Sequence, residues 1–165
     1  MISAIVAVDN NWGIGFNGNL LEHLPPDMKY FKELTSNNWV VMGRKTWDSL
    51  PKKPLPNRQH LIITNDPLNY KNTEDVLFVK MGQAKLIMNQ QKGLTFFVIG
   101  GGEVYKQLLP LCDRVYVTKI LRNYKNIDTY FPNLDKDPKW EVSTCTELRE
   151  YENIPYAFLT YDRIS

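Results

Sequence analysis

The sequence predicts an α/β protein with a mostly parallel central sheet of about eight strands, flanking helices and a C-terminal antiparallel hairpin. Three observations lead to this class. Short apolar runs typical of buried strands alternate with segments typical of helices. Two of those runs end in glycine turns. After Lys139 the pattern changes to a clearer alternation of apolar and polar residues, which is typical of antiparallel strands.

The predicted elements follow in order along the chain. Apolar runs predict six strands, at residues 2–8, 39–43, 60–64, 76–79, 95–100 and 113–120. Several runs are apolar on both faces, which indicates sheet interior covered by helices. Helices are predicted between them, at 26–35, from Arg44, at 83–91 and at 103–109. Pro26 suits a first helical turn and Pro110 ends the last helix. The segments 139–148 and 154–164 predict the final hairpin.

Composition bounds the class of protein. The chain has 165 residues, 43% of them hydrophobic and 23% charged, and a formal net charge of +2. These values are ordinary for a globular protein, and the length suits one domain over residues 1–165. Because no basic block occurs, no nucleic-acid partner and no anionic membrane surface is expected.

The N-terminal segment and the cysteines indicate a cytoplasmic protein. The segment has no basic region and its apolar run stops at Asp9, so we expect a first strand and not a signal peptide. No run is long enough to span a membrane. Cys112 and Cys145 lack the spacing of a zinc site or a redox motif. We interpret them as reduced packing residues, with an isolated disulfide as the alternative.

Two glycine turns follow apolar strands. In VVMGRKTW (40–47), Gly43 leads into Arg44, Lys45 and Thr46, a pattern that suits phosphate binding at the start of a helix. An ordinary strand-to-helix turn with two solvated bases is the alternative. In FFVIGGGEVYKQLL (96–109), three successive glycines favour close approach of a ligand over a simple tight turn. Neither standard nucleotide signature is present.

Few candidate catalytic groups are available. His23 and His60 are the only histidines, and neither has the setting of a triad or a metal site, so both are expected on the surface or in loops. No HExxH, GxSxG or paired-cysteine motif occurs. Hydrolytic and nucleophilic mechanisms therefore lack parts, and no metal is expected. A reaction whose difficult step belongs to a cofactor, such as hydride transfer, fits what remains.

Asp27 is the acidic residue that stands out. It shares a helical face with Phe31 and Leu34, the face expected to turn inward. The spacing leaves two explanations. An acid in the first turn of a helix is favoured by the helix dipole. Alternatively, a carboxylate in an apolar cleft would bind the N–H groups of a flat, nitrogen-rich ligand. Burial would raise its pKa and the helix terminus would lower it.

The ordered set of motifs resembles dihydrofolate reductase along essentially the whole chain. The stretch IGFNGNLLEHLPPDMKYFKELT (14–35) corresponds to the family's N-terminal signature. VVMGRKTWDSL, PLPNR, FFVIGGGEVY, VYVTKI and DTYFP follow in the family's order and at its approximate spacing. Such a set is far more specific than either glycine turn alone. The resemblance implies the dihydrofolate reductase fold and an enzyme of bacterial type.

For the substrate, the resemblance assigns a functional role to Asp27. In the family the matching acid binds the pterin through N3 and the 2-amino group and promotes protonation of N5, and Thr118 would support it. The remaining 2-amino hydrogens would be taken by the backbone carbonyls of Ile5 and Ile99. The walls around the ligand rings would come from Met28, Phe31, Leu50 and Leu55. Arg58 matches the arginine that pairs with the α-carboxylate of the glutamate tail.

For the cofactor, the resemblance implies NADPH. Its carboxamide would be held by the backbones of Ala7 and Ile14. Its pyrophosphate and adjoining ribose would lie against Gly101, Gly102, Val104 and Tyr105, with a further contact from Thr46. Its 2′-phosphate would be recognised near Arg44, Lys45, Thr64 and Asn65. The bond between Gly100 and Gly101 matches the family's cis peptide.

The implied reaction is hydride transfer from nicotinamide C4 to C6 of dihydrofolate, with a proton reaching N5 through water. Its product, tetrahydrofolate, supplies one-carbon metabolism. The loop around residues 10–24 would close over the nicotinamide and exclude water. Dihydrofolate and antifolate inhibitors are the implied partners, and a monomer is expected.

The sequence departs from the family in three places. Leu21-Glu22 stands where the family usually has Pro-Trp, whose tryptophan covers the pterin edge. Glu22 is expected to bring a second carboxylate near Asp27 and to raise the pKa of one or both groups. Reduced sensitivity to trimethoprim is a hypothesis based on this change. Ile127 replaces a common glycine and is expected to stiffen a loop. Glu103 stands where a base can occur, and is expected to weaken adenosine-side contacts.

Two other functions stay open. The first is a pterin- or pyrimidinone-reducing relative of the same fold, such as the reductase domain of riboflavin biosynthesis. Asp27, Phe31 and Arg58 argue against it, because they suit a pterin that carries a glutamate tail. The second is a non-catalytic nucleotide-binding module, which would bind NADPH without consuming it in the presence of dihydrofolate.

Overall fold

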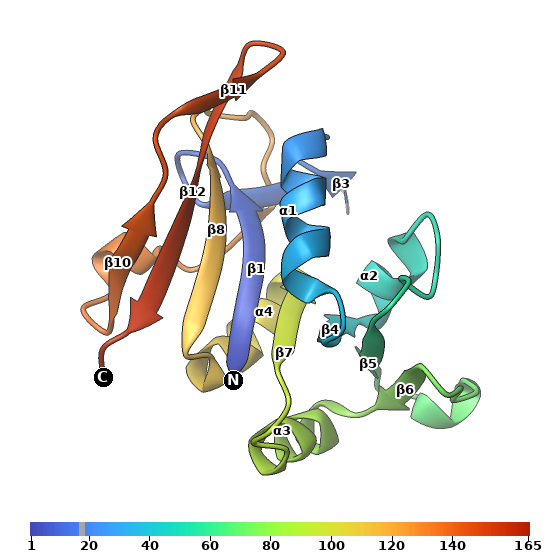
Figure 1. Cartoon of the computed structure of the whole chain (residues 1–165). Helices are drawn as coiled ribbons and strands as arrows, with labels where there is room; N and C mark the ends of the chain where they lie inside the picture. The colour runs from blue at the N-terminus through green and yellow to red at the C-terminus, as the bar shows by residue number, and fades with distance from the viewer. Residues whose placement is uncertain (17–18) are drawn as a thin grey trace.

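The computed structural model describes residues 1–16 and 19–165 and has the predicted α/β architecture (Figure 1). Its central sheet runs in the order β10-β12-β8-β1-β7-β4-β5-β6. Six of these strands lie close to their predicted bounds: β1 (Ile2–Val8), β4 (Trp39–Gly43), β5 (Gln59–Ile63), β6 (Val76–Val79), β7 (Phe96–Gly100) and β8 (Arg114–Ile120). The pairs that these six strands form with one another are all parallel.

The C-terminal hairpin completes the sheet beside β8. Its long strands, β10 (Trp140–Cys145) and β12 (Ile154–Arg163), pair antiparallel, and β12 also pairs antiparallel with β8. A further short strand, β11 (Arg149–Tyr151), pairs with β12 near the turn of the hairpin. The register places Thr118 of β8 between Ala7 of β1 and Phe158 of β12.

All four predicted helices are present. They are α1 (Pro25–Thr35), α2 (Arg44–Ser49), α3 (Met81–Gln90) and α4 (Gly102–Leu108). Pro26 lies in the first turn of α1, as expected. Pro110 follows α4 inside a short 3-10 helix, η2 (Leu109–Leu111). Two more 3-10 turns occur, η1 (Pro67–Asn69) and η3 (Leu134–Lys136).

A second, small antiparallel sheet was not expected from the sequence. Its strands, in spatial order, are β3 (Asn19–Leu20), β2 (Gly13–Phe16) and β9 (Thr129–Tyr130). They are too short, and β2 too rich in glycine, to give the alternating pattern of a strand. The sheet matters for the site because it ties the segment after β1 to the segment after β8.

Apolar side chains cover both faces of the central sheet. Because side chains alternate along a strand, Val41 joins the cluster that packs under α3 and α4, while its neighbours Val40 and Met42 join a cluster beside α2. A third cluster, here called the β8–β12 cluster, has as its buried members Leu24, Ile120, Tyr156 and Phe158. Thr118 alternates with Val117 of the α3/α4 side, so it faces the same side of the sheet as α1.

No helix of the described residues is both long and apolar enough to cross a lipid bilayer. Cys112 is buried and Cys145 is exposed, and both are free thiols, so the isolated disulfide is not formed.

Candidate active site

Asp27 lies in the first turn of α1, on the side of the helix that faces the sheet. Its backbone N–H donates to the carbonyl of Leu24, 2.9 Å away, which anchors the start of the helix. Asp27, Phe31 and Leu34 are half-buried, whereas the neighbouring polar residues Lys29, Lys32 and Glu33 are exposed. This is the division that helical spacing predicts.

The carboxylate of Asp27 is held by one buried hydroxyl. Thr118, which is 2% exposed, donates from Oγ1 to Oδ1 of Asp27 over 2.5 Å. Oδ2 accepts no hydrogen bond from the residues that the structure describes, so it can accept from a ligand. Burial raises the pKa of Asp27 above its ordinary value, and the hydrogen bond from Thr118 opposes this rise. The carboxyl group is therefore easier to protonate than a solvated one.

Glu22 does not act on Asp27 in the expected way. Its Oε2 accepts a hydrogen bond from the hydroxyl of Tyr124, 2.5 Å away. The raised pKa of Asp27 comes from burial and not from a neighbouring like charge, so the expectation that Glu22 would cause it is wrong. Glu22 is engaged with the segment that follows β8.

Tyr105 reaches the middle of the sheet from α4. Its hydroxyl donates to the carbonyl of Ile5, 2.6 Å away, and the side chain is buried. Burial is the largest cause of the raised pKa of this phenol, so it remains protonated as a donor. A carbonyl has two lone pairs, and the hydroxyl of Tyr105 uses one of those of Ile5. The hydroxyl contact of Tyr105 was not foreseen from the sequence.

The residues expected to wall the ligand separate into a packed group and an exposed one. Leu50 and Leu55 are partly buried and pack against the cluster beside α2, as does Ile99, which was expected to bind through its carbonyl and not as a wall. Phe31 is half-buried on α1. Met28 is 53% exposed and projects from the helix, so it can contact a ligand only at the edge of the site.

Arg58 is fixed in position before any ligand binds. Its Nε donates to the carbonyl of Pro56 over 2.8 Å, and its Nη1 donates to Thr35 Oγ1 over 3.1 Å. The guanidinium lies 5.9 Å from the ring centre of Phe31. Arg58 is only 6% exposed, yet it forms no ion pair with the acidic residues that the structure describes. Burial lowers its pKa, but a guanidinium stays charged in proteins. Such a group suits an incoming carboxylate.

The two glycine turns lie side by side at the carboxyl ends of neighbouring strands in the middle of the sheet. The strands β4 and β7 are parallel neighbours, and their register pairs Met42 with Gly100. Gly100 has a φ of +130°, which glycine adopts readily, and the Gly100–Gly101 peptide is cis, as expected from the resemblance. A Cβ on Gly100 or Gly101 would stand 3.6 Å from Oγ1 of Thr46. The missing side chains therefore leave the turn open beside a hydroxyl group.

This turn fits the phosphate groups of a dinucleotide. The residues that precede α2 and α4 are glycines, and neither helix start is capped by a side chain. The first backbone N–H groups of the two helices are thus not bound by a cap, and they lie near Thr46. Next to them, Gly43 pairs in register with Ile63, so Thr64 and Asn65 follow at the same carboxyl end of the sheet.

The two bases after Gly43 differ in their surroundings. Arg44 forms an ion pair with Asp48 of the same helix, 2.8 Å away, whereas Lys45 is exposed. Thr64 is buried and its Oγ1 accepts from the N–H of Asp66, while Asn65 is exposed. An incoming phosphate would thus meet Lys45 directly and would compete with Asp48 for Arg44.

The start of the expected loop is anchored by a residue that sequence reasoning missed. Asp9 is 1% exposed, and its Oδ1 accepts from the N–H groups of Asn11 and Gly13 at 2.9 and 2.8 Å. Its Oδ2 accepts from the N–H of Tyr124 at 3.2 Å. No motif marks Asp9, because its partners are backbone groups. Ala7 and Ile14, on either side, lie on β1 and β2.

Comparison with known proteins decides the family. A family model described as dihydrofolate reductase matches residues 1–163. The chain belongs to the dihydrofolate reductase family. A dihydrofolate reductase from Bacillus subtilis (strain 168) is 36% identical, over 99% of this chain and 95% of its own length. Dihydrofolate reductase type 9 from Escherichia coli is 36% identical, over 88% of this chain and 86% of its own length.

A solved structure agrees with these relatives. Dihydrofolate reductase from Enterococcus faecalis, complexed with NADP(H) and RAB-propyl, superposes with a TM-score of 0.86 at 34% identity, and the match covers 100% of this chain and 97% of that one. The resemblance read from the sequence is therefore confirmed, as is the fold. The enzyme class and the use of NADPH are confirmed at the level of the dihydrofolate reductase family.

One histidine lies where the sequence did not predict it. His60 was expected on the surface or in a loop, but it is fully buried in β5. Its Nε2 accepts from the N–H of Leu55 at 3.0 Å, and its Nδ1 lies 3.1 Å from the carbonyl of Asp75. Burial lowers its pKa, so the ring is neutral and links two loops. It thereby positions Leu55, one of the expected wall residues.

The two smaller departures from the family have structural partners. A Cβ placed on Gly13 would stand 2.9 Å from Cγ2 of Ile127, so Ile127 packs directly over β2. Glu103 accepts a hydrogen bond from Nε2 of Gln107 over 3.0 Å and so points along its own helix. Neither contact tests the expected stiffening or the weaker adenosine contacts, which stay predictions.

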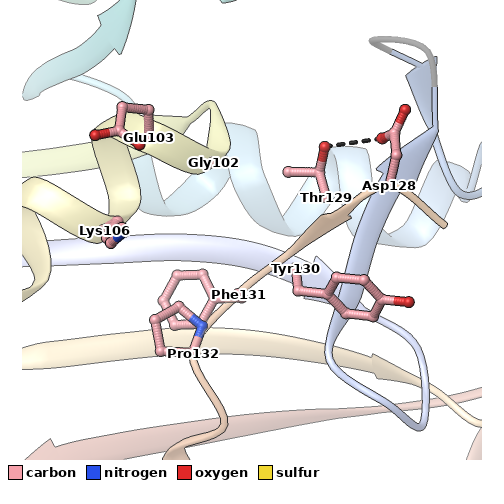
Figure 2. A pocket seen from close by; sticks show the side chains of 8 residues that line it. All are labelled: Gly102, Glu103, Lys106, Asp128, Thr129, Tyr130, Phe131 and Pro132. Atoms are coloured by element: carbon pink, nitrogen blue, oxygen red, sulfur yellow. Dashed lines mark hydrogen bonds between the residues drawn. The ribbon is translucent and has the colours of Figure 1, made fainter.

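A hollow of about 410 Å³ lies between α4 and β9 (Figure 2). Glu103 and Lys106 project from the α4 side, and Thr129 donates to Asp128 on the other side. A second hollow of about 430 Å³ lies beside the loop that carries Leu55 and Arg58. Asp27 lines neither of these two hollows and is sheltered where α1 packs against β8.

Proposed function

We propose that this chain reduces 7,8-dihydrofolate to 5,6,7,8-tetrahydrofolate with NADPH, by hydride transfer to C6 and protonation at N5. Membership in the dihydrofolate reductase family supports the reaction. The observation that carries the proposal is the sheltered carboxylate of Asp27, with one oxygen bound to Thr118 and the other able to accept. Sequence alone leaves a helix-dipole role open for Asp27, but its burial favours the ligand-binding role.

Asp27 would orient the pterin and ease its protonation. An ionised carboxylate that accepts from two N–H groups of a flat ring fixes both its plane and its direction. Because burial raises the pKa of Asp27, the group can hold a proton closer to neutral pH than a solvated aspartate. It thereby favours protonation of the bound ring, and water carries the proton to N5. The carbonyls of Ile5 and Ile99 would accept from the remaining hydrogens of the 2-amino group.

Arg58 would hold the glutamate tail. Its Nε is bound to Pro56 and its Nη1 to Thr35, which leaves N–H groups of the guanidinium for the α-carboxylate of the substrate. The guanidinium loses little freedom on binding, because these contacts already fix it. Phe31, Leu50 and Leu55 would contact the aminobenzoyl ring between the pterin and this arginine, and Met28 would lie at its edge.

NADPH, when bound, supplies the hydride. The residues that would hold it are those at the glycine-turn edge of the sheet, together with the backbones of Ala7 and Ile14. The open turn at Gly100 and Gly101, the backbone of Gly102 and the hydroxyl of Thr46 would bind the phosphates, with Val104 and Tyr105 behind them. Lys45 and Arg44 would bind the 2′-phosphate near Thr64 and Asn65, which favours NADPH over NADH.

The segment 10–24 would close over the reacting atoms and exclude water. Residues 17 and 18, which form part of this expected loop, lie outside the described residues. The flanking parts are held by Asp9 and by pairing of β2 with β9.

A spectrophotometric assay tests the proposal. Loss of NADPH absorbance that depends on dihydrofolate is expected. A non-catalytic nucleotide-binding module would bind NADPH without this loss, and a pyrimidinone reductase would consume NADPH only with its own substrate. Either result would overturn the proposal.

We also propose that Glu22 reduces sensitivity to trimethoprim. The support is its position, where the family usually has tryptophan at the pterin edge. Inhibition curves of the protein and of its Glu22→Trp variant are expected to differ, with the variant more sensitive. Identical inhibition curves would contradict the proposed role of Glu22 in trimethoprim sensitivity.

We further propose that residues 1–165 form a single domain that works as a monomer in the cytoplasm, without a nucleic-acid or membrane partner. The match of the family model to residues 1–163 supports one domain. Light scattering during size-exclusion chromatography should give one species with the mass of a single chain, and a larger mass would contradict the monomer.

A further inference from the structure

The two residues that depart from the family at the site both have partners in this protein. Leu21 packs against the β8–β12 cluster. Glu22 accepts a hydrogen bond from the hydroxyl of Tyr124 over 2.5 Å. Hydrogen bonds with a charged partner are stronger than neutral ones. A tryptophan at position 22 has no oxygen to accept this bond, so the contact depends on the carboxylate.

Tyr124 is itself fixed by its surroundings. Its backbone N–H donates to the buried carboxylate of Asp9, directly after β1, and its ring packs against the same β8–β12 cluster. Burial and the Glu22 carboxylate raise the pKa of the Tyr124 phenol. Of the other charged groups nearby, Asp9 raises this pKa further and Arg122 lowers it. A rigid donor makes the bond to Glu22 effective as a restraint, since little side-chain freedom remains to be lost.

The restraint lies close to Asp27 along the chain. Leu24, two residues after Glu22, is buried, and its carbonyl accepts from the N–H groups of Asp27 and Met28 at 2.9 and 3.0 Å. Two hydrogen bonds therefore fix the start of α1, one from β8 and one from the segment that follows β8. Thr118 binds the side chain of Asp27, and Tyr124 binds the segment that leads into the helix.

We propose that Tyr124 is a positioning residue for dihydrofolate reduction, acting through Glu22 to fix segment 21–24 beside the pterin site. The inference rests on the proposed function. Tyr124 need not touch the substrate to act in this way.

The experiment compares two Tyr→Phe variants in the full-length protein. Tyr124→Phe removes only the hydroxyl that binds Glu22. Tyr151→Phe is the matched control, because Tyr151 packs against the same cluster but its hydroxyl has no partner among the described residues. Tyr124→Phe is expected to lower kcat/KM for dihydrofolate about tenfold to a hundredfold, the range for a lost hydrogen bond to a charged group. Tyr151→Phe is expected to change it less than about twofold.

A double-mutant cycle separates positioning from a general structural effect. In a Glu22→Leu background, Tyr124→Phe should lower kcat/KM by less than about twofold, because its partner is already absent. An equal loss in both backgrounds, or no loss in the single Tyr124→Phe variant, would overturn the inference.

Hydrogen exchange of the ligand-free proteins gives a readout that does not depend on the reaction. The backbone amides of residues 21–24 and of Asp27 and Met28 should exchange faster in Tyr124→Phe than in the parent protein or in Tyr151→Phe. If the parent protein fails to reduce dihydrofolate, the proposed function fails, and unchanged exchange would still refute the restraint by itself.

Discussion

At the scale of single residues, the site depends on two charged side chains held in partly apolar surroundings. Asp27 is sheltered by α1 and β8 and bound by one hydroxyl, and Arg58 is buried without an acidic partner among the described residues. Each is a group whose charge is poorly compensated in the ligand-free protein. The substrate supplies what each lacks, because its ring offers N–H donors and its tail offers a carboxylate.

Replacing Asp27 by asparagine should stabilise the protein at neutral pH. The raised pKa means that the folded protein binds this proton more tightly than the unfolded chain does, so stability falls as the pH rises from the unfolded pKa, about 4, to the folded one. The amide oxygen of the new side chain would still accept from Thr118, but the amide would not ionise. We expect a gain of about 1 kcal/mol, or a few degrees in Tm, at neutral pH and almost none near pH 4. Thermal melts over a pH series measure this, and a variant less stable than the parent at pH 7 would contradict it.

Replacing Arg58 by lysine should weaken binding of the glutamate tail. Lysine keeps the charge but loses the planar fork and the bonds to Pro56 and Thr35. The KM for dihydrofolate should rise about tenfold or more. Dihydropteroate, which has no glutamate, is the control substrate and should show little change. An equal rise for both substrates would show that Arg58 acts on the fold and not on the tail.

The residues that sequence reasoning found and those it missed differ in the kind of partner they have. Asp27 was found because a carboxylate on an apolar helical face is unusual, and the family motif then gave its role. His60 and Asp9 were missed because their partners are backbone groups of distant loops. No sequence pattern records such contacts. Tyr124 was missed for a similar reason, since its partner Glu22 lies in a segment far away along the chain.

At the scale of elements, replacing a glycine by alanine should change the stability of the protein in opposite directions in α4 and α3. A Cβ on Gly102 would stand 2.6 Å from Cγ2 of Thr129 in β9, whereas a Cβ on Gly82 would meet nothing within 4 Å. Gly102→Ala should destabilise the protein by about 1–3 kcal/mol through this clash. Gly82→Ala should stabilise it by up to about 1 kcal/mol through helix propensity. Chemical denaturation measures both, and a neutral Gly102→Ala would show that α4 and β9 are not tightly packed.

The long elements were predictable and the short ones were not. Strands such as β4 and β7 are apolar runs that end in glycine, and α1 has a clear helical face, so local pattern defines them. β2 pairs with β3 a few residues away, but it also pairs with β9, about a hundred residues further along the chain. Their pairing depends on the positions of β1 and β8, and local sequence carries no trace of it.

At the scale of the whole molecule, the central sheet brings the two glycine turns together at the carboxyl ends of β4 and β7, where the cofactor would bind. Because β4 and β7 are parallel neighbours, their carboxyl ends meet although about fifty residues separate them. The strand order that achieves this could not be read from residue patterns, and only the family resemblance implied it.

NADPH should stabilise the folded protein more than NADH. At a concentration of about 100 times its Kd, a ligand of the folded state adds about 2.7 kcal/mol, or roughly 5–10 °C in Tm for a chain of this size. NADH lacks the phosphate that Lys45 and Arg44 would bind, so its shift should be smaller at equal concentration. Lys45→Gln should reduce the difference between the Tm shift caused by NADPH and that caused by NADH. Equal shifts for both nucleotides in the parent protein would contradict the proposed 2′-phosphate contacts.

The most direct test of the central claim is the rate of dihydrofolate-dependent NADPH consumption by Asp27→Asn at neutral pH. The variant should remain folded and keep its NADPH-induced rise in Tm, which shows that the cofactor edge is intact. If Asp27 binds the pterin and eases its protonation, kcat/KM should fall by about a hundredfold or more. Activity equal to that of the parent protein would contradict the role of Asp27 and, with it, the proposed active site.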